Sequence, residues 1–167
     1  MDIDDTAERD LLLARLNGQR RHVLTQLEGL SEQQLRLPVL PSGWSCLGLV
    51  RHLTLSDERY WFEVVVAGEP LDFWPEGDNG DWQVGPEEPV ADVLDAYRSA
   101  IARSDDIVSA RSLGDAPQQP EAWWHDAGLS FPDLRTVVVH VLVETSVHAG
   151  HLDVVRELLD GHQYLVL

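Results

Sequence analysis

Apolar side chains recur every three or four residues along four stretches of the chain, a spacing that places them on one face of an α-helix. The pattern predicts helices over residues 6–29, 45–68, 90–110 and 132–161. No run of alternating apolar and polar residues indicates a strand. Four long helices with one apolar face each are best buried against one another. We therefore expect an all-α fold, a four-helix bundle, in a single domain spanning residues 1–167.

Three residues mark the ends of predicted helices. Ser45 can cap the N-terminus of the second helix. Pro132 suits the first turn of the fourth helix, and Gly161 suits the left-handed residue that follows its last turn.

Long breaks rich in proline, glycine and aspartate separate the helices, and their length leaves the connectivity of the bundle open. Breaks as long as 69–88 are often lids or binding loops inside a small domain. Four of the six tryptophans lie in the breaks at 69–88 and 111–130, where they either anchor the loops or line the mouth of a pocket: Trp74, Trp82, Trp123 and Trp124.

The charge balance excludes several classes of partner. The 167 residues carry 12 basic side chains, all of them arginine, against 29 acidic ones, for a net charge of −17. Such a surface repels phosphate backbones and anionic lipids, so we expect neither nucleic acid nor membrane as a partner. No apolar stretch approaches the roughly 18 residues of a membrane span, and the acidic first residues do not form a signal peptide. Cys46 is alone, which excludes a disulfide, and we expect it to be a small buried filler in a cytoplasmic protein.

Candidate chemistry lies on the fourth predicted helix, which is apolar almost all round and should be buried. Four polar side chains fall on it within an arc of roughly 80° at 100° per residue: His140, Glu144, His148 and His151. Glu144 and His148 are four residues apart on one face, so both can reach a single ion. A buried carboxylate also needs a positive or hydrogen-bonding partner.

A third ligand must come from another helix, and His52 in the second predicted helix is the candidate. Two imidazoles and a carboxylate form the ligand set of catalytic zinc sites, and the same set suits ferrous iron. The alternative at each position is a side chain hydrogen-bonded within the core. His140 is either a core histidine or an orienting partner, His151 is the catalytic candidate as an acid/base or orienting group, and Glu58 is an ion-pair or capping residue.

The residues also resemble a known family. PSGWSCLGLVRHL (41–53) followed by ERYWFEVVVAGE (58–69) resembles the second-helix signature of the DinB/DUF664 superfamily. DAYRSAIARSDDIV (95–108) resembles its third helix, and DLRTVVVHVLVETSVHAGHLDVVRELLDG (133–161) resembles its last long helix. The resemblance implies a DinB-like four-helix bundle, often a dimer, that binds one divalent metal through helices two and four. In the branch similar to mycothiol-dependent maleylpyruvate isomerase, the metal ligands fall on His52, Glu144 and His148.

The resemblance implies a metal-dependent transferase or isomerase that uses a low-molecular-weight thiol such as mycothiol and an electrophilic small molecule. Zinc is the first choice of metal, with nickel, iron and manganese as alternatives. A bound metal would lower the pKa of the thiol. Two other hypotheses stay open: a metal-dependent hydrolase with His151 as proton shuttle, and a non-catalytic bundle that binds a ligand or partner.

Overall fold

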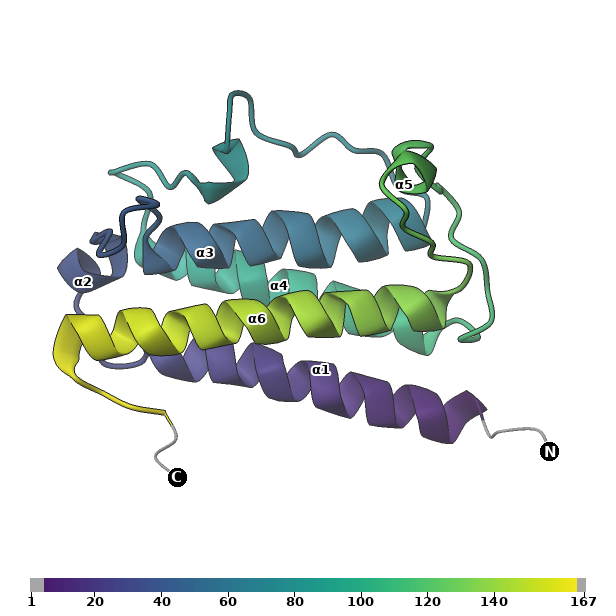
Figure 1. Cartoon of the computed structure of the whole chain (residues 1–167), viewed down its shortest axis with the longest axis horizontal. Coiled ribbons are helices and arrows are strands. Elements are labelled where there is room, and N and C mark those ends of the chain that lie inside the picture. Colours follow the sequence, from purple (N-terminus) through teal and green to yellow (C-terminus); the bar gives the residue numbers. More distant parts are fainter. Residues whose placement is uncertain (1–4, 165–167) are drawn as a thin grey trace.

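The computed structural model describes residues 5–164, and every regular element in that part of the chain is helical. The elements are α1 (Asp5–Leu27), α2 (Glu32–Arg36), α3 (Cys46–His52), η1 (Leu53–Val66), η2 (Gly80–Trp82), α4 (Val90–Ser109), α5 (Trp123–Asp126) and α6 (Leu134–Asp160). The prediction of an all-helical fold is confirmed. The long helices run side by side, with α1 against α6 and α4 against η1, while the 69–88 segment and α5 cover one side of α3 and η1 (Figure 1).

The helix ends follow their capping residues. The Ser45 side chain accepts a hydrogen bond from the Gly48 amide at 3.1 Å, which starts α3. Asp133 caps α6 in a reciprocal arrangement with Thr136, and Gly161 ends that helix with a φ of 78°. The predicted bounds of the long helices are therefore correct to within about two residues. The short elements α2, η2 and α5 lie in segments where the sequence indicated only loop.

The second long helix differs from the prediction of one continuous α-helix over 45–68. After His52 it widens into η1, a π-helix, in which the Ala67 amide donates to the Phe62 carbonyl five residues earlier at 2.9 Å. Hydrogen bonds of this kind bring residues about five apart onto one face. The face that carries His52 therefore continues to Asp57, which an ordinary α-helix would turn away.

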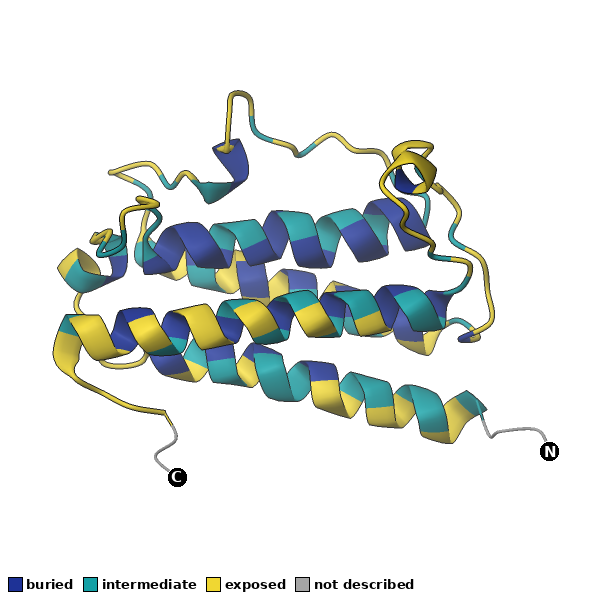
Figure 2. Ribbon diagram, in the orientation of Figure 1, coloured by how far each residue is buried: buried dark blue, intermediate teal, exposed yellow. Residues whose placement is uncertain are grey.

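The core consists of two apolar clusters along the facing sides of the long helices (Figure 2). One cluster includes Leu16, Phe62, Val65, Val138 and Val141, and the other includes Val23, Leu49, Leu53, Tyr97 and Leu152. Cys46 belongs to the second cluster at 1% exposure, and burial raises the pKa of its thiol to about 11. The expectation of a buried filler at Cys46 is confirmed.

Buried polar side chains separate these clusters along the sequence of each long helix. We call Arg20, Asp57, Glu58, Ser104 and Thr145 the polar layer. Arg20 donates to both carboxylate oxygens of Glu58 at 2.7 and 2.5 Å, and to Asp105 at 2.7 Å. One guanidinium therefore joins α1, η1 and α4, and the expected ion-pair role of Glu58 is confirmed.

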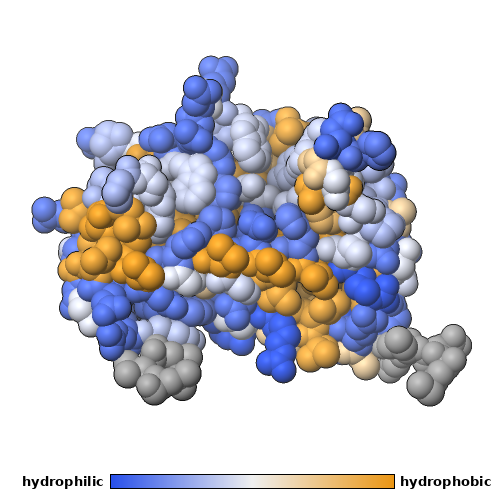
Figure 3. All heavy atoms as spheres, viewed as in Figure 1, coloured by the Kyte–Doolittle hydropathy of each residue, from blue (hydrophilic) through white to orange (hydrophobic). Residues whose placement is uncertain are grey.

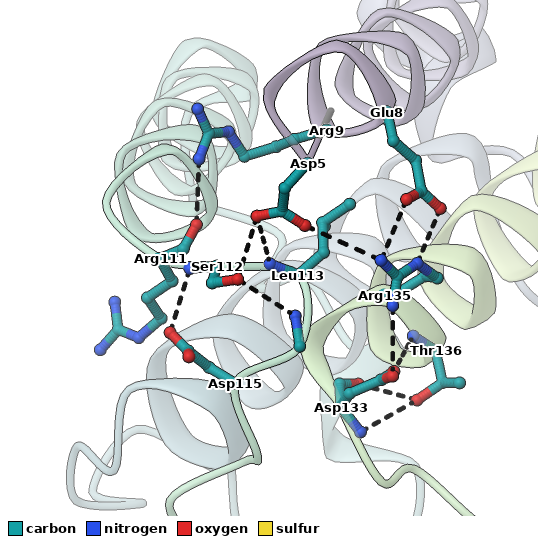
Figure 4. A network of polar contacts seen from close by, with 11 residues as sticks. Asp5, Glu8, Arg9, Arg111, Ser112, Leu113, Asp115, Asp133, Arg135 and Thr136 are labelled. Atoms are coloured by element: carbon teal, nitrogen blue, oxygen red, sulfur yellow. Dashed lines mark hydrogen bonds and ion pairs between the residues drawn. The ribbon is translucent and has the colours of Figure 1, made fainter. Parts of the chain in front are cut away.

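A second polar network ties the chain together where α1 begins and α6 begins (Figure 4). Arg135 donates to both oxygens of Glu8 at 2.7 and 3.0 Å, which lowers the pKa of that carboxyl. Asp5 accepts from the Ser112 hydroxyl and the Leu113 amide, and so holds the segment after α4 against α1. Within residues 5–164, no helix has the combined length and apolarity needed to cross a bilayer.

Candidate functional site

A cavity of about 560 Å³ opens beside η1 and α6. Its walls come from these two helices, from the last residue of α3, from the 69–88 segment and from α5. The lining residues are His52, Ser56, Asp57, Tyr60, Trp61, Leu71, Trp74, Trp123, His140 and Glu144. Two of the three predicted metal ligands, His52 and Glu144, thus share one cavity although 92 residues separate them.

His52 is held in place by the turn η2. Its Nδ1 lies 2.6 Å from Oδ2 of Asp81, and its ring stacks on Trp82 with centroids 4.1 Å apart. Asp81 is itself buried. A carboxylate on one ring nitrogen fixes the tautomer and orientation of a histidine and leaves the other nitrogen free to bind, as is usual for metal-ligating histidines.

A glycine in α3 allows this turn to approach. A Cβ added to Gly48 would lie 2.6 Å from the Trp82 carbonyl oxygen, closer than such atoms can come without a shift. Gly48 is four residues before His52, so the turn that carries Asp81 packs one helical turn from the histidine it contacts. Sequence analysis did not identify Asp81 or Trp82 as partners of His52, and a glycine inside a predicted helix was the available signal.

His148 lies beside His52, with ring centroids 5.0 Å apart. Its Nδ1 atom is buried and has no hydrogen-bond partner among the described residues. Burial, together with smaller contributions from the neighbouring His52 and His151, lowers the pKa of His148 to about 4. The imidazole is therefore neutral at pH 7, which is the form that binds metals.

The other two histidines of α6 have different surroundings. His151 is exposed, with its ring centroid 5.6 Å from that of His148. His140 packs against the rings of Trp61 and Phe131 at 4.5 and 4.9 Å, and burial lowers its pKa. His140 thus belongs to the aromatic wall of the cavity, while the role of His151 stays a prediction.

The three predicted metal ligands are neighbours but do not converge on one point. In residues 5–164, no group of three or more histidine, cysteine, aspartate and glutamate side chains is arranged to hold a metal ion as it stands. The chemistry of His52, Glu144 and His148 nevertheless fits a divalent metal. His52 has an oriented ring, His148 has a buried nitrogen without a partner, and Glu144 faces the cavity that His52 lines.

Asp57 was missed by the sequence analysis because α-helical geometry turns it away from His52. It is 3% exposed, lines the cavity, and has no hydrogen-bond partner for Oδ2 among the described residues. Burial raises the pKa of Asp57 well above its ordinary value, and the charges of Glu58 and Glu144 raise it further. The Thr145 hydroxyl and Arg20 offset this only in part.

The loop tryptophans divide between the two roles that the sequence left open. Trp74 and Trp123 line the cavity, and Trp82 stacks on His52. Trp124 is 5% exposed and stacks on Trp61 in the core, so it anchors its loop. The Tyr60 hydroxyl donates to Glu121 at 3.1 Å and thereby ties the segment before α5 to η1; burial and Glu121 raise the pKa of Tyr60 to about 12.

Fold and site together define an all-helical protein with a histidine and carboxylate cluster beside an aromatic cavity. A family model described as mycothiol S-transferase matches residues 11–161. The chain therefore belongs to the mycothiol S-transferase family, which is a DinB-like family. No curated protein and no solved structure matches the chain.

Proposed function

We propose that the chain is a metal-dependent S-transferase that joins a mycothiol-type thiol to an electrophile, with the metal held by His52, Glu144 and His148. The observation that carries the proposal is the pair of neighbouring histidines, one oriented by Asp81 and the other with a buried free nitrogen. Family membership supports the thiol. The donor set favours zinc, with nickel, iron or manganese as alternatives.

A divalent metal at this position would lower the pKa of a bound thiol below neutrality, so that the thiol is present as the thiolate nucleophile. In the transfer, the sulfur forms a bond to the electrophilic carbon, the leaving group departs with its bonding electrons, and the thiol proton passes to solvent. Asp81 holds the ring of His52, and the aromatic walls of the cavity exclude water from the reacting carbon. His151, exposed beside His148, would carry the proton outward.

We also propose that the four long helices form the DinB-like bundle of the DUF664 type, and that the protein works as a homodimer in the cytoplasm. An exposed apolar stripe along α6 supports the dimer (Figure 3). The stripe contains Val139, Val143, Val147, Val154 and Leu158, each 42% to 60% exposed. Sedimentation equilibrium tests the dimer: we expect the mass of a dimer for the wild type and of a monomer for Val143→Glu, which places a charge in the stripe. A monomer in both would contradict the dimer.

The metal site is tested by metal analysis of the purified protein with plasma mass spectrometry. We expect about one divalent transition-metal ion per chain in the wild type and in His125→Ala, whose ring is 97% exposed in α5. We expect loss of that metal in His52→Ala, Glu144→Ala and His148→Ala. A full metal equivalent retained in His148→Ala would exclude the proposed ligand set.

The reaction is tested with metal-loaded protein, mycothiol and a fluorogenic alkyl halide. We expect thioether formation that depends on both metal and thiol. His151→Ala should keep the metal and lose activity, because it removes an acid/base group and no ligand. Turnover of ester or amide substrates without any thiol would instead favour the hydrolase.

A further inference from the structure

The cavity contains aromatic side chains for which metal binding gives no role. Tyr60 and Trp61 come from η1, Trp74 from the 69–88 segment and Trp123 from α5. Trp74 is 42% exposed and Trp123 is 48% exposed, yet both face the same space from different loops. Large exposed apolar side chains gathered around one cavity are typical of a ligand site.

The rings meet at steep angles and so enclose a corner. Tyr60 is 5.5 Å from Trp61 at an interplanar angle of 80°, and 6.2 Å from Trp74 at 72°. Perpendicular rings present faces and edges to one space, and an aromatic face carries a partial negative charge that attracts cations. A flat ring can stack in such a corner, and a positively charged substituent gains an additional attraction.

The charged groups of the cavity point to the same preference. Asp57 and Glu144 line it, Glu121 lies at the Tyr60 hydroxyl, and no arginine is among the lining residues. Arg59, on the same helix as Tyr60, is directed elsewhere: its guanidinium lies 3.7 Å from the Phe73 ring centroid and it pairs with Glu63. An anion in the cavity would lie near the carboxyl groups of Glu144 and Glu121 with no lining arginine to offset them, whereas a cation would be attracted by the same groups.

We propose that this cavity binds the aromatic group of the electrophile, and that it selects an uncharged or, preferably, positively charged ring over one that carries a carboxylate. The identification of the ligand as an electrophile rests on the proposed function. The charge selectivity rests on the residues of the cavity alone. A divalent metal does not reverse it, because Glu144 and a thiolate together offset two positive charges.

The test is equilibrium binding of three probes that share one ring and differ in charge: benzyltrimethylammonium, benzyl alcohol and phenylacetate. Binding is measured by calorimetry and by quenching of tryptophan fluorescence, using the purified protein after chelator treatment and without added thiol, so that neither a metal nor a thiolate contributes charge. We expect the cation to bind about tenfold more tightly than phenylacetate, with the alcohol between them. Phenylacetate binding as tightly as the cation, or no binding of any probe at millimolar concentration, would overturn the proposal.

Variants locate the binding and separate the contributions. Trp74→Ala and Trp123→Ala, both partly exposed, should weaken binding of the cation about tenfold, while Leu11→Ala, an exposed apolar residue of α1 outside the cavity, should leave it unchanged. Glu121→Gln should reduce the ratio of cation to alcohol affinity, and this ratio is internal to each variant, so a partial loss of folded protein does not affect it. An unchanged ratio in Glu121→Gln would contradict the electrostatic part of the proposal.

The outcome is distinguishable from that of the proposed function. If no metal binds but the order of the three probes holds, the S-transferase proposal fails and the charge selectivity of the cavity stands. If thiol transfer occurs and benzyl halides with a carboxylate substituent react as fast as those with a trimethylammonium substituent, the function stands and the selectivity fails.

Discussion

Asp57 and Glu58 are consecutive buried carboxyl groups on one helix, and their surroundings are opposite. Glu58 receives two hydrogen bonds from Arg20, which is itself bound to Asp105. Asp57 has no partner for Oδ2 and lines the cavity. Burying a charge is costly unless it is paired, so the paired group can serve the fold and the unpaired one indicates a site for something else to bind.

The histidines show the same contrast. His22 on α1 pairs with Asp153 of α6 at 2.7 Å, and this pair joins two helices. His148, five residues before Asp153, has a buried nitrogen with no partner among the described residues. In both comparisons the group that joins two helices is paired, while Asp57 and His148 each have a buried atom without a partner among the described residues. Four changes test this distinction, in order of decreasing effect.

The largest effect is expected from Glu58→Ala. It leaves the guanidinium of Arg20, 1% exposed, without its main partner, and breaking a buried pair in this way costs about 3–5 kcal/mol. Urea unfolding followed by circular dichroism measures the loss. A change below about 1 kcal/mol would show that Arg20 finds another partner and that the pair is not structural.

The second effect concerns the metal. Asp81→Ala should weaken zinc binding about 10- to 100-fold, because His52 loses the carboxylate that orients its ring, and Asp81→Asn should recover part of the affinity. Competition with a chromophoric chelator measures the affinity, and Asp78→Ala in the same loop is the control. Gly48→Ala should also weaken zinc binding, because the added Cβ displaces η2 and with it Asp81. If both variants bind zinc as tightly as the wild type, Asp81 does not support the metal site through His52.

The third effect is a gain of stability in Asp57→Asn that depends on pH. Below the ordinary carboxyl pKa of 3.8, Asp57 is protonated in both the folded and the unfolded protein, so its ionisation does not affect the free energy of unfolding. As the pH rises, the unfolded chain releases this proton first, because burial raises the pKa in the folded protein. Wild-type stability is therefore lost toward neutral pH, and the Tm advantage of Asp57→Asn should grow between pH 4 and pH 8.

Thermal unfolding across this range measures the difference, with the exposed Asp10→Asn as control. Each kcal/mol corresponds to a Tm change of about 2–4 °C in a chain of this size. A Tm difference that is constant with pH, or that shrinks as the pH rises, would contradict the assignment.

The smallest effect is expected from Arg98→Ala. Arg98 pairs with Asp95 at 2.8 Å on the surface of α4, with both side chains more than half exposed, and such pairs contribute about 0.2–1 kcal/mol. Urea unfolding in low and high salt measures it. A loss as large as that of Glu58→Ala would remove the distinction between surface and buried pairs.

The helices could be predicted from the sequence because their signals are local. Ser45 and Gly161 mark helix ends through interactions within a few residues, and the apolar period of α6 is visible in its letters. The neighbourhood of His52 and His148 could also be predicted, because both lie on apolar helix faces that must be buried.

Other parts of the site depend on nonlocal structure. Asp57 faces the cavity only because η1 is a π-helix, and α-helical spacing gives the wrong face. Asp81 reaches His52 across 29 residues through a turn in a long loop, where no periodicity exists to place it. Trp74 and Trp124 both lie in long loops without apolar periodicity, so the sequence does not distinguish them. Packing places Trp74 at the cavity and Trp124 in the core.

The burial of Cys46 has a consequence if the protein acts, as we propose, on alkylating compounds. Lysine amines and cysteine thiolates are the side chains most readily modified by such compounds, and this chain has no lysine and one cysteine. That thiol is 1% exposed and, with a pKa of about 11, is almost entirely protonated at neutral pH. The folded protein thus presents little of its own to be damaged by the molecules we propose it consumes, and any thiol that disappears during turnover belongs to the cosubstrate.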